Sequence, residues 1–375
     1  MIGREAETKE VAASLMAGTN LVIAGPRRTG KTSVCEAALN LAASRGFYTG
    51  VVDLFRIPDT ASLAEALVSS TIANRGMVRK LLHQVRTSGR TLADATSRAA
   101  ALKIKTELGD DVEIAFAPGL AEKDPEKYLT YALELPDRIS RLDGKPMIVF
   151  FDEFQEVVNP RKPYGEPDQL TKRMRAIFQR SGEVSYLFAG SLEHLMRELF
   201  APGNRAFSQF GSFFALRPID EAAWRVGLSE RFEADDCKID DLAINEIIGL
   251  GGLHPRATML IAQKTHLASI MLSTRAIELA TVRQGFDLAL EGDVPSNEQA
   301  VERIRQTHKL GFLIARRVAL GEEPYRGLDD SEAYRALKAL ERGGFVERIS
   351  RGNWQIFNPL LKRYLADLDP VGPIA

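Results

Sequence analysis

The feature that most constrains this chain is a stretch of nine residues, GPRRTGKTS, at positions 25–33. It matches the pattern G-x-x-x-x-G-K-T at Gly25, Gly30, Lys31 and Thr32. In such a loop the glycines let backbone N–H groups wrap around phosphates, the lysine reaches the terminal phosphates, and the threonine hydroxyl ligates Mg²⁺. The pattern has this meaning only between a strand and a helix.

Both flanks of the loop have the required patterns. Residues 20–24, NLVIA, form a short apolar run that is typical of a strand buried on both faces. Residues 31–46 have helical spacing and end at Gly46, which predicts a helix with a glycine C-cap. The sequence therefore predicts a nucleotide-binding loop that consists of Gly25, Gly30, Lys31, Thr32 and Ser33.

A second apolar run, residues 147–151, leads directly into Asp152 and Glu153. Open α/β sheets bind ligands at the carboxyl ends of their strands, so we expect this acidic pair beside the phosphate loop. Asp152 is expected to hold Mg²⁺ together with Thr32, and Glu153 to be the general base that activates water. An acidic pair after a strand can also be a plain helix N-cap. The phosphate loop favours the catalytic interpretation, in which Lys31 contacts the reacting phosphate.

Another strand is predicted at residues 184–189, and it brings Ser191 to the same edge of the sheet. Two roles are open for the Ser191 hydroxyl at this edge. It is a sensor that contacts the γ-phosphate or the attacking water, or it caps the next helix. Residues 47–54 and 212–216 predict two further strands. Together these segments predict an α/β fold, a three-layer core around a sheet of about five parallel strands with right-handed crossovers.

The composition limits the partners and the compartment. Lys and Arg number 49 and Asp and Glu 50, a net charge of −1, so the whole chain gives no electrostatic argument for nucleic acid or an anionic membrane. Two cysteines and five scattered histidines predict neither a disulfide framework nor a metal site beyond nucleotide-bound Mg²⁺. The charged start, MIGREAETKE, and the lack of a long apolar run predict a cytoplasmic protein without a signal peptide or a membrane span.

The pattern along the chain predicts three domains. Residues 1–218 are expected to form the P-loop core, and residues 219–293 a helical lid, the kind of element that closes over bound nucleotide. Residues 294–375 are expected to begin with a turn and a long helix, and to end in a helix, a two-stranded hairpin and a short helix, the back half of a winged helix. Residues 321–375 hold eight Lys and Arg against nine Asp and Glu, which favours packing against the core or a protein partner over DNA contact.

Five motifs, taken in order, carry a family likeness: IGRE at residues 2–5, GPRRTGKTS, FFDEFQEV at 150–157, AGS at 189–191 and GGLHP at 251–255. They resemble the archaeal-type P-loop ATPases, AAA-like proteins whose core has an additional strand and which are related to STAND signalling ATPases and origin-recognition initiators. The resemblance covers residues 1–368. It implies ATP and Mg²⁺ as ligands, Walker A and Walker B motifs at the loop and the acidic pair, and a C-terminal winged helix.

The resemblance also implies roles for four residues outside the core motifs. Arg4 is a candidate for the base site, and Pro255 for contact with the adenine. Arg256 takes the place of the second sensor arginine of initiators. The family usually has one residue between the second glycine and the proline, whereas this chain has two, Leu253 and His254. Arg205 resembles an arginine that acts on ATP in a neighbouring subunit, which implies a homo-oligomer in the ATP state; a solvated surface arginine is the alternative.

One local segment is strongly basic. Residues 75–105 hold eight Lys and Arg against a single Asp, with a spacing that predicts a pair of helices. Initiator ATPases carry a DNA-contacting insertion in this general region, so Arg79, Lys80 and Arg86 are candidates for salt-dependent contact with duplex DNA. The alternative is a solvated helical face whose charge is balanced by the acidic residues 107–113.

Three functions are therefore open. The leading hypothesis is a slow, partner-stimulated ATP hydrolase that acts as a nucleotide-dependent regulatory switch, with a protein as its partner. The second is an initiator-like or transposition-type ATPase that assembles on duplex DNA. The third is a nucleotide-stabilised interaction module with negligible turnover. The intact pair Asp152 and Glu153 stands against the third, because a pure binder needs no general base.

Overall fold

The computed structural model describes residues 1–74, 124–159, 162, 167–201, 203, 206–350 and 352–368 of the 375-residue chain. The chain divides into two compact units. We call the first the core unit, residues 6–25 and 31–216, and the second the helical unit, residues 1–5, 26–30 and 217–375. Among the residues described, no helix is long and apolar enough to cross a membrane.

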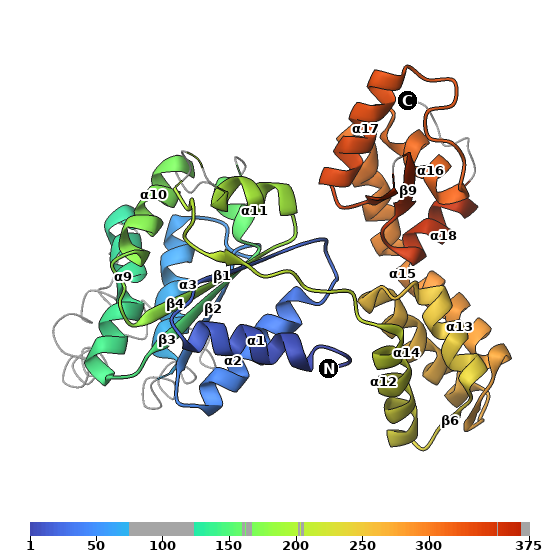
Figure 1. Ribbon diagram of the computed structural model, residues 1–375, viewed down its shortest axis with the longest axis horizontal. Coiled ribbons are helices and arrows are strands. Elements are labelled where there is room, and N and C mark those ends of the chain that lie inside the picture. Colours follow the sequence, from blue (N-terminus) through green and yellow to red (C-terminus); the bar gives the residue numbers. More distant parts are fainter. Residues whose placement is uncertain are drawn as a thin grey trace. The chain divides into compact units, whose positions relative to one another are not determined.

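The core unit is built on one parallel sheet with the strand order β2-β3-β4-β1-β5 (Figure 1). Its strands are β1 (Leu21–Ala24), β2 (Tyr48–Asp53), β3 (Met147–Asp152), β4 (Val184–Gly190) and β5 (Ser212–Phe213). The predicted sheet of five parallel strands is confirmed, although β5 is shorter than expected. Because β4 lies between β1 and β3, one additional strand separates the strand before the phosphate loop from the strand that carries Asp152.

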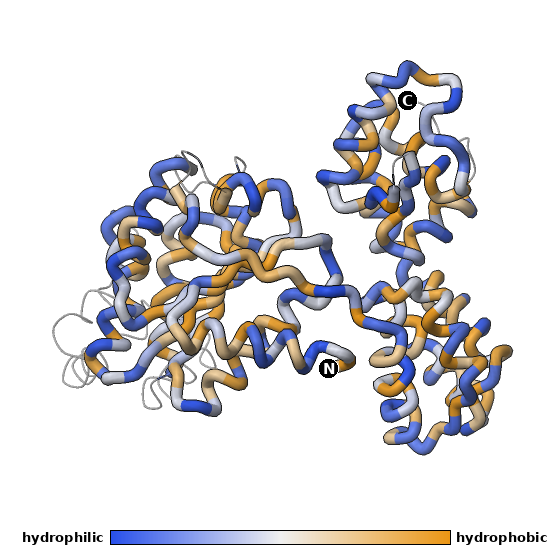
Figure 2. The backbone as a smooth tube through the Cα atoms, in the orientation of Figure 1, coloured by the Kyte–Doolittle hydropathy of each residue, from blue (hydrophilic) through white to orange (hydrophobic). Residues whose placement is uncertain are grey.

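Helices cover both faces of this sheet, which confirms the three-layer core. They include α1 (Glu5–Met16), α2 (Lys31–Ser44), α3 (Thr60–Ile72), α9 (Pro125–Asp143) and α10 (Pro167–Phe178). Leu21 and Ile23 of β1 share an apolar cluster with α1 and α2, whereas Val22 shares another with α3, α9 and α10. Successive side chains of a strand point to opposite faces, so a strand between two helical layers must be apolar throughout. The central strands meet this requirement (Figure 2).

Short polar signals set the ends of these helices. Asp59 caps α3 by accepting a hydrogen bond from the backbone N–H of Ser62 at 2.8 Å. Asp124 caps α9 in the same way, with the N–H of Lys127 at 3.0 Å. α2, which follows the phosphate loop, ends before Gly46, whose φ of 91° is left-handed, as the sequence predicts.

The helical unit begins with four helices around one apolar cluster. They are α12 (Glu221–Ala234), α13 (Asp241–Gly251), α14 (Pro255–Met271) and α15 (Leu279–Thr307). Trp224, Ile247 and Ile261 are buried members of that cluster. Two short strands, β6 (Lys238–Ile239) and β7 (Ala276–Ile277), pair in parallel. The helices predicted for this part of the chain are thus present, while their action as a lid stays a prediction.

α15 corrects one detail of the sequence analysis. The turn expected at residues 294–300 is wrong, because α15 runs without interruption through this stretch with Pro295 inside it. Proline and its polar neighbours favour a break. Both halves of the helix are nevertheless packed, Ala289 in the cluster of α12–α14 and Val301 in the next cluster. Packing therefore outweighs the local preference for a turn. A domain boundary at residue 293 would fall within α15, and this boundary stays a prediction.

After α15 the chain forms two helices, a hairpin and a last helix. They are α16 (Gly311–Leu320), α17 (Asp330–Arg342), β8 (Val346–Ser350), β9 (Asn353–Ile356) and α18 (Pro359–Asp367). α17 ends at the predicted glycine pair, where Gly344 has a φ of 73°, and β8 and β9 pair antiparallel. Leu337 and Trp354 belong to the apolar cluster that these elements share. The elements occur in the predicted order, while their classification as a winged helix stays a proposal.

Candidate functional site

The phosphate loop leaves β1 at Ala24 and enters α2 at Lys31. Gly30 has a φ of 90°, a conformation that glycine adopts at little cost. An added Cβ at Gly25 or Gly30 would meet no atom within 4 Å, so the loop has open space beside both glycines. The loop leads into the N-terminus of α2, whose unpaired N–H groups and dipole favour an anion. These features fit a phosphate cradle.

Lys31 is the buried cation of this loop. It is 6% exposed, and its Nζ donates to the backbone carbonyl of Gly25 at 2.8 Å. The ammonium group therefore lies inside the loop, at the first glycine of the motif. A charge that is largely removed from water interacts strongly with an opposite charge brought next to it. The position of Lys31 in the loop is the one that the motif requires, and contact with a phosphate stays a prediction.

Thr32 and Asp152 come together although 120 positions separate them in the chain. Thr32 Oγ1 donates to Asp152 Oδ2 at 2.8 Å. Burial raises the pKa of Asp152, and hydrogen bonds from Thr32 and from the backbone of Glu153 partly offset that increase. A hydroxyl and a carboxylate are hard oxygen donors, and Mg²⁺ commonly binds one or two such groups together with phosphate oxygens and water. The pair therefore fits Mg²⁺ that arrives with a nucleotide.

In the described parts of the chain, no three His, Cys, Asp or Glu side chains are grouped so that they could hold a metal ion.

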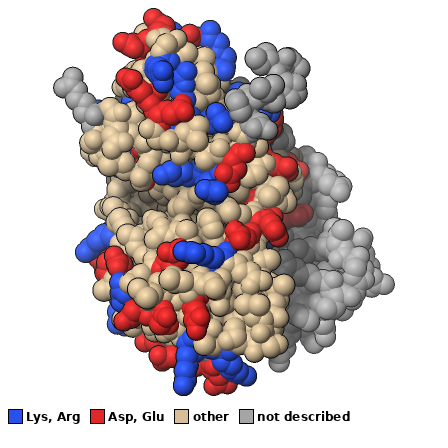
Figure 3. Space-filling view, turned by 90° about the vertical axis from the view of Figure 1, so that its right-hand side faces the viewer, with Lys and Arg blue, Asp and Glu red and all other residues tan. Residues whose placement is uncertain are grey.

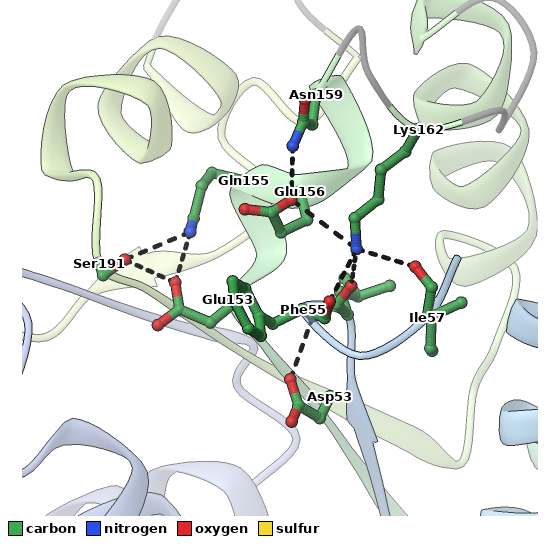
Figure 4. A network of polar contacts seen from close by, with 10 residues as sticks. Asp53, Phe55, Ile57, Glu153, Gln155, Glu156, Asn159, Lys162 and Ser191 are labelled. Atoms are coloured by element: carbon green, nitrogen blue, oxygen red, sulfur yellow. Dashed lines mark hydrogen bonds and ion pairs between the residues drawn. The ribbon is translucent and has the colours of Figure 1, made fainter. Parts of the chain in front are cut away.

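The carboxylate of Glu153 is bound by two neighbouring side chains (Figure 4). Its Oε2 accepts hydrogen bonds from Ser191 Oγ at 2.6 Å and from Gln155 Nε2 at 2.5 Å. Ser191 and Gln155 are both buried, and their own polar atoms are 3.4 Å apart. Glu153 has a φ of 51°, which is uncommon outside glycine and turns the chain from β3 into the 3₁₀-helix Phe154–Val158. Backbone conformations of this kind cluster at functional sites.

Gln155 is a residue of this site that the sequence analysis missed. It is 2% exposed, and a Cβ added to Gly190 would come within 2.5 Å of Gln155 Oε1. Gly190 therefore leaves the space that the glutamine side chain needs. The available sequence signal is its place two residues after Glu153 in FFDEFQEV. That signal is weak, because the left-handed turn at Glu153, rather than strand periodicity, decides where the Gln155 side chain goes.

The Ser191 hydroxyl makes one contact that bears on its two interpretations. It donates to Glu153 Oε2, so Ser191 belongs to the carboxylate network. The next residue, Leu192, holds the N-cap position of α11 (Glu193–Phe200). Contact of Ser191 with the γ-phosphate and capping of this helix both stay predictions.

Lys162 supports the neighbouring loop after β2 (Figure 4). Its Nζ donates to three backbone carbonyls, those of Leu54, Phe55 and Ile57, at 2.6, 3.0 and 2.8 Å. The same nitrogen lies 3.8 Å from Glu156 Oε2, in the 3₁₀-helix that follows Glu153. β2 pairs with β3 as far as Asp53, which lies opposite Asp152. Lys162 therefore fastens the loop after β2 to the segment that carries the acidic pair.

In the helical unit, Arg4 bonds to backbone rather than pointing to solvent. It is 3% exposed, its Nη1 donates to the carbonyl of Arg217 at 2.5 Å, and its Nη2 donates to the carbonyl of Thr29 at 3.3 Å. Thr29 belongs to the phosphate loop. Arg4 therefore joins the three chain segments that make up the helical unit, and its contact with a base stays a prediction.

The start of α14 explains why two residues precede Pro255. His254 is the N-cap of the helix, and its Nδ1 accepts a hydrogen bond from the N–H of Ala257 at 3.2 Å. Burial, followed by the charges of Arg256 and Arg28, lowers the pKa of His254 to about 4. The imidazole is therefore neutral at pH 7, as a ring nitrogen that accepts a hydrogen bond must be. Pro255 follows at N1, where its missing N–H leaves no hydrogen bond unmade.

Arg256 binds a buried carboxylate on α15. Its Nη1 lies 3.0 Å from Asp293 Oδ2 and its Nη2 lies 2.5 Å from Asp293 Oδ1, and Asp293 is 1% exposed. Arg28 of the phosphate loop contacts the same helix, with its Nη2 2.6 Å from Ser296 Oγ. Sequence analysis missed Asp293 and Arg28, because no local pattern links them to Arg256.

The remaining predicted residues are Arg205, Arg79, Lys80 and Arg86, and they lie outside the residues that the structure describes. The action of Arg205 on a neighbouring subunit and the contact of the three basic residues with DNA stay predictions.

Comparison with known proteins identifies the fold. No protein-family model matches the chain, and no curated protein matches its sequence. The structure is similar to that of a Walker-type ATPase of Pyrococcus abyssi, with a TM-score of 0.70 and 16% identity over 97% of this chain and 96% of that chain. It is also similar to the ORC2 protein of Aeropyrum pernix in its ADPNP–ADP complexes, with a TM-score of 0.60 and 15% identity over 96% and 91% of the two chains. This chain therefore has the α/β fold of the Walker-type P-loop ATPases.

Proposed function

We propose that this protein binds and hydrolyses ATP with Mg²⁺ and acts as a nucleotide-dependent regulatory switch. The observation that carries the proposal is the edge of the core sheet where Lys31 lies in the loop, Thr32 bonds to Asp152, and two donors bind Glu153. A phosphate cradle, a pair of Mg²⁺ ligands and a carboxylate are the parts that ATP hydrolysis requires. The fold shared with a Walker-type ATPase adds support.

Binding of ATP is expected to rearrange few contacts in the loop. A phosphate oxygen would take the place of the Gly25 carbonyl at Lys31 Nζ, while loop N–H groups contact the other oxygens. Thr32 and Asp152 would hold Mg²⁺, which when bound neutralises charge that develops on the phosphates. The bond between Thr32 and Asp152 shows that the hydroxyl and the carboxylate already face each other.

Hydrolysis needs a base that accepts the proton of the attacking water. Oε2 of Glu153 is engaged by both Ser191 and Gln155 in this conformation. If Oε2 rather than Oε1 is the basic atom, one of these hydrogen bonds must first be exchanged for one from water. A partner that favours this exchange would speed the reaction, which is the physical reason for proposing slow, partner-stimulated turnover.

We extend the proposal to residues that the core motifs do not include. Arg4, Pro255 and Arg256 are proposed to take part in nucleotide binding, and Arg205 to act on the nucleotide of a neighbouring subunit in an ATP-bound homo-oligomer. For Arg4 the support is its bond to the carbonyl of Thr29 in the phosphate loop. For Arg256 it is the nearby charge of Arg28, a residue of that loop.

The test compares three variants of the full chain. Lys31→Ala is expected to abolish ATP binding, because the buried ammonium is removed. Glu153→Gln is expected to bind ATP normally but to hydrolyse it about two to four orders of magnitude more slowly, because the amide cannot accept the proton. Glu193→Gln is the matched control, because Glu193 is a partly exposed residue on the first turn of α11 that pairs with Arg197, and it should behave like the wild type. Calorimetric ATP binding and phosphate release are the readouts, and normal turnover by Glu153→Gln would contradict the assignment of the base.

Assembly on duplex DNA is a second candidate function with one structural feature in its favour. We propose that residues 311–367 form a winged helix, since α16, α17, the β8–β9 hairpin and α18 follow its order of elements. On the face drawn in Figure 3, however, the described Lys and Arg side chains are interspersed with Asp and Glu, which is a poor surface for phosphates.

DNA and protein partners can be separated by one experiment. ATP hydrolysis is measured with and without duplex DNA at about 50 and 200 mM salt, together with the mass of the protein in solution. Stimulation and assembly that disappear at the higher salt would support the DNA-binding function. Hydrolysis that is indifferent to DNA would favour a protein partner.

A further inference from the structure

A groove lies between α12 and α14, two helices of the helical unit that both pack against α13 (Figure 1). Its volume is about 520 Å³, and all of its lining residues belong to these two helices. Three of the lining side chains, Leu228, Phe232 and Ala262, are apolar and buried. The groove is therefore an apolar hollow that the helical unit forms by itself.

The apolar surface continues beyond the groove along α14. Leu267, Ile270 and Met271 are 40%, 61% and 60% exposed. Leu267 follows the groove residues Gln263 and Leu260 by four and seven positions, and Ile270 and Met271 follow Leu267 by three and four. Side chains at these spacings lie on one face of a helix, so the five residues form one row, which we call the α14 stripe. A contiguous row of exposed apolar side chains marks an interaction site, whereas single ones need no explanation.

One charged side chain at the groove has no counter-charge. Arg256, at one end, binds Asp293, and His266 Nε2 lies 3.9 Å from Asp235 Oδ2. Arg231 is exposed, and it forms no hydrogen bond or ion pair with any residue that the structure describes. A guanidinium group binds carboxylates well. The groove thus suits a ligand that combines an apolar face with an acidic group.

We propose that the groove and the α14 stripe bind an amphipathic helix of a protein partner, with an acidic residue of that helix opposite Arg231. Two packed helices leave a groove into which a third helix fits its residues i, i+3, i+4 and i+7. From Leu260 to Met271 the stripe extends about 17 Å along the axis of α14, which corresponds to about three turns of a partner helix. A small apolar molecule in the groove would leave the exposed end of the stripe uncovered. This binding requires neither ATP nor its hydrolysis, so it goes beyond the proposed function.

The test uses the full-length protein and a fluorescein-labelled probe peptide of about 16 residues, with leucine at helical i, i+3, i+4 and i+7 spacing and glutamate or alanine elsewhere. Fluorescence anisotropy is expected to give a dissociation constant of about 10 to 100 µM, as for a small transient interface. A matched peptide with lysine in place of glutamate should bind at least about fivefold more weakly, because Arg231 then faces a like charge.

Variants of the protein locate the binding surface. Leu267→Gln and Ile270→Gln should each weaken binding of the acidic peptide by about fivefold or more, because each removes an apolar contact. Arg231→Gln should weaken it by about threefold and abolish the preference for the acidic peptide. Val226→Gln is the matched control, since Val226 is 58% exposed on α12 and does not line the groove, and should bind like the wild type. Circular dichroism checks that these surface variants fold.

Three outcomes would overturn the proposal. The first is that the wild type fails to bind the acidic peptide at about 1 mM, or that Leu267→Gln and Ile270→Gln bind it as the wild type does. The second is that both peptides bind equally well, which would remove the role of Arg231. The third is a wild type that is dimeric at about 50 µM while Ile270→Gln is monomeric, as measured by sedimentation. A second copy of this chain, rather than a partner helix, would then cover the α14 stripe.

Discussion

The candidate site of the core unit and the middle of α15 in the helical unit hold their charged side chains by different means. In the core unit, neutral donors bind Glu153 and a backbone carbonyl binds Lys31, all at the ends of strands or within the loop. In the helical unit, a buried carboxylate at the middle of a long helix binds Arg256. Neutral contacts on a sheet fix the direction of a side chain. A charge pair on a helix responds to any further charge that approaches it.

This difference lets each unit be tested by its own measurement. The proposed ATP hydrolysis reports on the core unit, which holds Lys31, Thr32, Asp152 and Glu153. Each prediction below changes one unit at a time. Both tryptophans, Trp224 and Trp354, lie in the helical unit, so tryptophan fluorescence follows the unfolding of that unit alone.

The largest expected effect concerns the helical unit and the pKa of His254, which burial lowers to about 4. Well above pH 6.5 the imidazole is neutral in both states, so its contribution is constant. As the pH falls from 6.5 toward 4, the unfolded chain takes up a proton that the folded unit excludes, and the free energy of unfolding should fall by about 2 kcal/mol between pH 7 and pH 5. Urea unfolding followed by tryptophan fluorescence measures this loss.

The variant that tests this expectation is His254→Asn, which keeps a side-chain acceptor at the N-cap of α14. It should lose that part of the pH dependence, while His266→Asn, a half-buried histidine later on the same helix, should keep it. An unchanged pH dependence in His254→Asn would show that another group is responsible.

A somewhat smaller effect is expected in the core unit from Gln155→Met. Methionine has a similar volume but donates no hydrogen bond, so Glu153 Oε2 would keep Ser191 as its donor and be open to water. The substitution also removes Gln155 Oε1, which is buried without a hydrogen-bond partner in the described structure. Turnover should rise by about tenfold, equivalent to about 1.4 kcal/mol of barrier, with ATP affinity unchanged. A drop in turnover would mean that Gln155 orients the base rather than restrains it.

The smallest effects come from a matched pair of helix caps, one in each unit. Asp59 caps α3 through the N–H of Ser62, and Asp240 caps α13 through the N–H of Ala243 at 2.7 Å. Replacement of either by alanine should lower the free energy of unfolding by about 1 kcal/mol. If the two units unfold independently, tryptophan fluorescence will detect Asp240→Ala and not Asp59→Ala. Equal shifts from both variants would show that the two units unfold as one.

Local patterns of the sequence predicted most of the core. The strands β1, β3 and β4 are apolar runs because helices cover both of their faces, and Gly30, Lys31 and Thr32 follow a strand at the spacing that a phosphate loop needs. The same logic failed at residues 294–300, where proline and polar residues predicted a turn. Packing of α15 on both sides kept the helix intact, and no local pattern contains that information.

What the sequence by itself determined is the phosphate loop, the acidic pair and the order of the elements, because each depends on residues that are neighbours in the chain. Only the tertiary structure decided which distant side chains form hydrogen bonds with one another. Ser191 and Gln155 meet at Glu153 because β4 lies beside β3, and Arg256 meets Asp293, 37 positions away, because α14 packs on α15. Such contacts arise from packing between elements, which spacing along a single chain segment does not encode.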